Sequence, residues 1–86
     1  MKTYRTQEEV PWGEITAVLY WYLEMQVEDI WRHQKRGDQR VVELSLPRLR
    51  ETRENIRRLR RFLGYSGETK WEREARRLLE QETQPL

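Results

Sequence analysis

The chain has 86 residues, of which 36% are hydrophobic and 37% charged, and its formal net charge is +2. This length corresponds to one domain, which buries only about 60–65% of its unfolded surface and therefore has a marginal core. The sequence contains no cysteine, which excludes disulfides and thiolate metal sites and favours a cytoplasmic location. The apolar runs are too short for a membrane span, and residues 1–10 lack the apolar segment of a signal peptide.

The first predicted element, after an N-terminal arm at residues 1–10, is a long helix over residues 11–36. Pro11 suits the first helical position, and Gly37 suits the left-handed cap at the end. At about 100° per residue, one face of this helix is apolar over about 140° of arc. We expect this face to form the core, and it contains Trp12, Ile15, Leu19, Tyr22, Leu23, Val27 and Ile30.

A second set of apolar residues lies on the other side of this helix. Val18, Trp21 and Met25 follow one another at helical spacing and point away from the first face. A helix that is apolar on both sides is normally buried on both sides, and so short a chain cannot cover both. We therefore expect a second copy or another protein to cover these three residues, with Trp21 as the anchor. The alternative is that Trp21 is exposed or covered by the N-terminal arm.

Residues 37–44 have no clear helical signal. The β-branched residues in this segment are too few for a strand without a visible partner. We expect an extended connector that places Val42 and Leu44 against the core. A short strand between two chains of a dimer is the alternative.

Two more helices are predicted, at residues 45–63 and 66–82. Ser45 is a suitable N-cap, and Pro47 would lie in the first turn. The mostly apolar seam of the first of these helices follows alternating spacings of three and four: Leu49, Thr52, Ile56, Leu59 and Leu63. The short link between the helices predicts an antiparallel hairpin packed on the long helix. The predicted fold is thus all-α with three helices in one domain, and dimeric.

Arginines on one flank of the predicted 45–63 helix are the strongest polar feature. This arginine stripe consists of Arg50, Arg53, Arg57, Arg60 and Arg61. Like charges at i, i+4 cost an isolated helix roughly 0.2–0.5 kcal/mol per pair, so negative groups should lie opposite. In order of preference, the candidates are the acids of the long helix, an acidic surface of another protein, and nucleic-acid phosphate. The acids in question are Glu24, Glu28 and Asp29.

The residues that usually carry catalysis or bind metals are scarce. His33 is the only histidine, and the two serines, Ser45 and Ser66, are better explained as helix caps. Glu28 and His33 are five residues apart, which does not match the Glu-x-x-His spacing of helical metal sites. We expect no catalytic residue, metal, cofactor or small-molecule substrate. Membrane-surface binding is also not expected, because acids line the long helix.

These features predict a small, non-enzymatic regulatory protein that acts through protein–protein contacts. It would be a homodimer, or a subunit or inhibitor docked on a larger assembly. Val18, Trp21 and Met25 would make the apolar contacts, and the arginine stripe would face the partner. The alternative function is nucleic-acid binding through the stripe.

Overall fold

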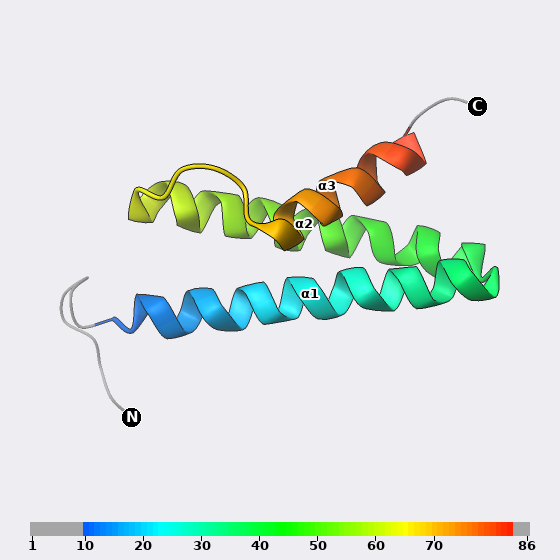
Figure 1. The fold of residues 1–86 in the computed structure, drawn as a ribbon, viewed down its shortest axis with the longest axis horizontal. Helices are drawn as coiled ribbons and strands as arrows, with labels where there is room; N and C mark the ends of the chain where they lie inside the picture. Colours follow the sequence, from blue (N-terminus) through cyan, green and yellow to red (C-terminus); the bar gives the residue numbers. More distant parts are fainter. Residues whose placement is uncertain (1–9, 84–86) are drawn as a thin grey trace.

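The computed structural model describes residues 10–83, which fold into three packed helices without a strand in that range (Figure 1). The helices are α1 (Trp12–Arg36), α2 (Gln39–Leu63) and α3 (Lys70–Thr83). The prediction of an all-α, three-helix fold is confirmed, whereas the dimer stays a prediction. Residues 1–9, which hold most of the predicted N-terminal arm, and residues 84–86 lie outside the described part of the chain. None of the described helices combines the length and the apolar character that crossing a bilayer requires.

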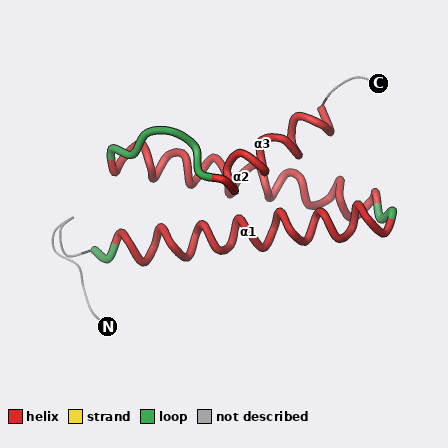
Figure 2. The backbone as a smooth tube through the Cα atoms, viewed as in Figure 1, coloured by secondary structure: helices red, strands yellow, loops and turns green. Residues whose placement is uncertain are grey.

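The helices α1 and α2 form an antiparallel hairpin and lie side by side along most of their length (Figure 2). The turn between them is short because Gly37 adopts a left-handed conformation, with φ of 80°. The amide of Gly37 donates to the Gln34 carbonyl at 3.1 Å, and that of Asp38 donates to the His33 carbonyl at 2.9 Å. These bonds satisfy carbonyls at the end of α1, as the sequence predicts from Gly37.

The core is a single apolar cluster to which all three helices contribute. Each of its residues is at most 8% exposed: Leu23, Val27, Ile30, Val42, Leu46, Leu49, Ile56, Ala75 and Leu78. The helix α3 lies on one side of the hairpin, where the indole rings of Trp31 and Trp71 meet with centroids 5.8 Å apart. The core therefore lies between the hairpin and α3, and the opposite side of the hairpin has no helix from the described residues on it (Figure 1).

The helix α2 begins at Gln39, so the predicted extended connector at residues 37–44 is wrong. Val42 and Leu46, which are 0% and 8% exposed, extend the apolar seam of α2 toward its start. Their burial against α1 stabilises the helix by tertiary packing, which outweighs the weak helix propensity of this segment. Leu44 is 70% exposed and does not pack against the core as expected. Ser45 does not cap the helix, because its hydroxyl donates to the Val41 carbonyl at 2.8 Å.

The start of α3 also differs from the prediction, because Ser66 precedes the helix and Thr69 caps it. The Thr69 amide donates to a Glu72 carboxylate oxygen at 2.7 Å, and the Glu72 amide lies 3.4 Å from the Thr69 hydroxyl. This reciprocal pair is a capping box. The link between α2 and α3 is thus the segment 64–69, which is longer than the sequence analysis expected.

Pro47 lies inside α2, where its ring removes one helical hydrogen bond. We expect Pro47→Ala to stabilise the protein by about 1–3 kcal/mol, since alanine restores the missing donor. Urea unfolding followed by circular dichroism measures this change. The exposed Arg50→Ala on the same helix is the control and should shift stability by less than about 0.5 kcal/mol. A destabilising Pro47→Ala would contradict the placement of residues 39–46 in the helix.

Candidate interaction surface

An apolar strip consisting of Val18, Trp21 and Met25 runs along the side of α1 that faces away from the core. Their exposed fractions are 62%, 58% and 40%. The core residues Leu23 and Val27 of the same helix are fully buried. The two sets differ because helical periodicity turns them to opposite sides of α1. We call these three exposed residues the outer α1 strip. Its position agrees with the sequence analysis, and its role as an interface stays a prediction.

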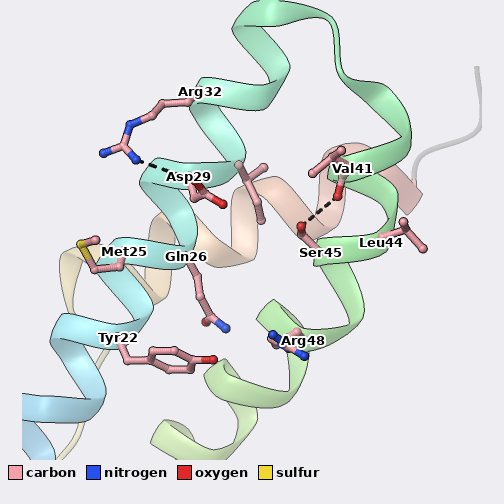
Figure 3. A pocket seen from close by; sticks show the side chains of 10 residues that line it. Tyr22, Met25, Gln26, Asp29, Arg32, Val41, Leu44, Ser45 and Arg48 are labelled. Carbon is pink, nitrogen blue, oxygen red and sulfur yellow. Dashed lines mark hydrogen bonds and ion pairs between the residues drawn. The ribbon is translucent and has the colours of Figure 1, made fainter.

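A groove of about 500 Å³ lies next to this strip, between α1 and the first half of α2 (Figure 3). Its apolar lining includes Tyr22 and Met25 from α1 and Val41 and Leu44 from α2. Met25 belongs to both surfaces and makes them continuous. The sequence did not predict this groove, because Tyr22, expected in the core, is 41% exposed, and Val41 and Leu44, expected in a connector, belong to α2.

The lining of the groove includes a polar side chain, Gln26, that has no hydrogen-bond partner in the described part of the chain. The amide nitrogen and oxygen of Gln26 are both buried, and neither has a hydrogen-bond partner among the described residues. Figure 3 shows Gln26 extending from α1 toward α2, close to Tyr22 and Arg48. An unpaired buried amide costs roughly 1–3 kcal/mol, so a group that donates to or accepts from Gln26 would bind favourably.

Charged residues lie at the upper rim of the groove. Arg32 forms long ion pairs of 3.7 Å with Glu28 and with Asp29, all on exposed or half-buried parts of α1. His33 lies 3.7 Å from Asp29 and 3.1 Å from Asp38. Ion pairs of this kind contribute little and exchange partners easily. The acids of α1 therefore interact with the end of their own helix, and the expected pairing with the arginine stripe is wrong for Glu28 and Asp29.

The arginine stripe is split between two environments. Arg53, Arg57 and Arg60 face the segment 64–69 and the start of α3, and their side chains are between 13% and 35% exposed. Arg50 and Arg61 are exposed, and neither has an ion-pair partner within residues 10–83. Three of the five residues predicted to face a partner thus have acceptors within the chain.

Glu72 is the centre of these contacts and has no exposed surface. Its carboxylate lies 3.3 Å from Arg57 and 3.5 Å from Arg60, and its backbone carbonyl accepts a hydrogen bond of 3.0 Å from Arg53. A buried carboxylate stays charged only where such partners replace water. Three oxygens of Glu72 thus tie α3 to α2: Oε2, which also accepts from the Thr69 amide, lies near Arg60, Oε1 lies near Arg57, and the backbone carbonyl accepts from Arg53.

Arg60 connects this cluster to α1. Its guanidinium donates to the Tyr20 hydroxyl and, at 2.9 Å, to the Ser66 carbonyl. The guanidinium carbon also lies 5.5 Å from the centre of the Tyr65 ring. The hydrogen bond to Tyr20 is the main cause that raises the pKa of Arg60 above its ordinary value, against the effect of burial. Arg60 therefore joins α1, α2 and the segment 64–69 in one contact.

Glu68 is the second carboxylate of the cluster. It accepts hydrogen bonds from Arg76 at 3.1 Å and from Arg53 at 2.5 Å. The bond from Arg76 is the largest cause that lowers the pKa of Glu68 below its ordinary 4.5, and the bond from Arg53 adds to it, while burial opposes both. Glu68 and Glu72 were overlooked as partners of the stripe, although the T-x-x-E pattern at Thr69–Glu72 is visible in the sequence.

No group of three or more potential ligands that could hold a metal ion occurs within residues 10–83. Comparison with protein-family models, curated proteins and solved structures finds no match to this chain.

We expect Glu72→Gln to destabilise the protein by about 2–4 kcal/mol, because it leaves the half-buried Arg57 and Arg60 without their countercharge. Chemical unfolding at pH 7 measures the change. Glu74→Gln is the matched control on α3, since among the described residues Glu74 pairs only with the exposed Arg77, at 3.1 Å. The control should cost less than about 1 kcal/mol. Equal effects of the two substitutions would contradict the central role of Glu72.

The lowered pKa of Glu68 makes its contribution dependent on pH. The unfolded chain takes up this proton at a higher pH than the folded chain, so the contribution is complete above the unfolded pKa and is lost as pH falls through the lowered folded pKa. We expect the stability difference between wild type and Glu68→Gln to be largest near pH 7 and to shrink below pH 4.5. Urea unfolding between neutral and acidic pH measures it, and a difference that stays constant would contradict this assignment.

Proposed function

We propose that this chain is a non-enzymatic regulatory protein that binds another protein chain through the outer α1 strip and the adjoining groove. It acts either as a homodimer or as a subunit or inhibitor docked on a larger assembly. The observation that carries the proposal is the exposure of Val18, Trp21 and Met25, which are 62%, 58% and 40% exposed on one side of a helix.

The composition of this surface supports a protein partner. Contiguous apolar patches with a polar rim are typical of interaction sites, and tryptophan, tyrosine and methionine are enriched at their centres. Trp21, Tyr22 and Met25 provide all three types, and the ion pairs of Arg32 lie at the edge. The unpaired amide of Gln26 adds a polar group that a protein backbone or side chain can satisfy.

Nucleic-acid binding through the arginine stripe is the alternative, and the contacts of the stripe favour it less. Arg53, Arg57 and Arg60 already bind carboxylates or carbonyls of the same chain. Phosphate would have to displace these acceptors or bind to Arg50 and Arg61 alone. Few phosphate contacts give weak binding at physiological salt.

A photo-crosslinking residue in place of Trp21 tests the proposal in cells that contain the protein. We expect a protein adduct of discrete mass, formed either with a second copy or with another chain, because the strip is in contact with it. The same residue in place of Arg58, which is exposed on α2, is the control and should give no such adduct. In a chain that carries both the crosslinking residue at position 21 and Val18→Glu, we expect no adduct, since a charge would disrupt the apolar contact.

The absence of any adduct specific to position 21 would overturn the proposal. A mobility shift of labelled nucleic acid that disappears in Arg50→Ala/Arg61→Ala and falls steeply between about 50 and about 200 mM salt would favour the alternative.

A further inference from the structure

Two residues of the outer α1 strip and two charged residues on the same face of α1 form complementary pairs about the level of residue 23, whereas Val18 has Glu28 as its counterpart. Trp21 and Met25 lie two residues on either side of position 23, and Glu14 and Arg32 lie nine residues on either side of it. All four are exposed. Glu14 and Arg32 are 18 residues apart, which is five full helical turns, so they share one face of α1 about 27 Å apart.

We propose that a second copy of this chain binds the strip, with the two α1 helices antiparallel around a two-fold axis that lies on the strip side of α1 at the height of residue 23. The proposal depends on the proposed function, because it names the occupant of that surface. In this arrangement each Trp21 lies beside Met25 of the other copy, and each Glu14 faces Arg32 of the other copy. A two-fold axis produces both contacts twice.

Charge complementarity favours this orientation over the parallel one. Parallel helices in register would place Glu14 beside Glu14 and Arg32 beside Arg32, and like charges at close range repel. The antiparallel order converts both repulsions into attractions. Glu14 has no ion-pair partner within residues 10–83, and Arg32 has only pairs of 3.7 Å with its own helix, so both are available.

The apolar centre also fits a self-complementary contact. Sulfur–aromatic contacts are favourable, and a ring that meets a flexible thioether packs well even at a helix crossing. Helices that cross at about 20° stay close over several turns, and the long side chains of Glu14 and Arg32 span the remaining separation at the ends. Val18, Trp21 and Met25 stay 62%, 58% and 40% exposed with α2 and α3 in place, so neither of these helices covers the strip.

Sedimentation velocity over chain concentrations from about 1 µM to about 1 mM tests self-association, since this range covers most specific protein contacts. We expect a monomer–dimer equilibrium that Trp21→Glu weakens by roughly 30-fold or more. Arg58→Glu, on the exposed side of α2, is the matched control and should leave it unchanged. Far-ultraviolet circular dichroism confirms that each variant is helical.

Charge reversal tests the orientation. Glu14→Arg and Arg32→Glu should each weaken the dimer by roughly 10-fold, because each substitution turns two attractive pairs into repulsive ones. The double variant should restore the affinity to within a few-fold of wild type. A double variant as weak as the product of the single ones would overturn the antiparallel pairing.

Cysteine crosslinking gives a second measurement, because the natural chain has no cysteine. Chains with Glu14→Cys and with Arg32→Cys, distinguished by mass, are mixed and treated with a short bis-maleimide. We expect mixed dimers in preference to either like pair, whereas a preference for like pairs would indicate parallel helices and overturn the proposal.

A monomer at every concentration would also overturn this proposal. If the crosslink from position 21 still formed with a different protein, the proposed function would stand without the dimer. If the chain formed neither a dimer nor a crosslink from position 21, the proposed function would be overturned as well.

Discussion

The pairing of arginines on α2 with carboxylates at the start of α3 is the interaction on which the arrangement depends. Glu72 has no exposed surface, and a buried carboxylate requires charged or hydrogen-bonding partners. Arg57 and Arg60 provide them only where α3 now lies. Because this position is on one side of the α1–α2 hairpin, no helix formed by residues 10–83 covers the other side of α1. The polar cluster thus determines which apolar residues are available to a partner.

The sequence predicted α1 almost to the residue, because several signals agree there. Its apolar periodicity, Pro11 and the left-handed Gly37 all indicate the same boundaries. At the start of α2 the local signals predicted the wrong boundary, because Ser45 and Pro47 are typical of a helix start, whereas the helix begins at Gln39. The helix begins earlier because Val42 and Leu46 are buried. Their burial depends on where α1 lies, and the local helix propensity of residues 39–46 carries no information about that.

The candidate surface was predictable in part for the same reason. Helix geometry alone turns Trp21 away from Leu23, so its exposure follows from counting residues. The groove could not be predicted, because it requires α2 to extend far enough to place Val41 and Leu44 beside α1. The partners of the arginine stripe depend on the path of the segment 64–69, which the sequence does not predict. The T-x-x-E pattern does indicate that Glu72 lies in the first turn of a helix that begins after Thr69.

The contact between Trp31 and Trp71 has a spectroscopic consequence. Their ring centroids are 5.8 Å apart and their planes are inclined by 48°. Two indoles so close and so oblique couple their electronic transitions, which gives a paired signal in ultraviolet circular dichroism. Because one ring belongs to α1 and the other to α3, the docking of the last helix has an optical signature separate from the helical content of the hairpin.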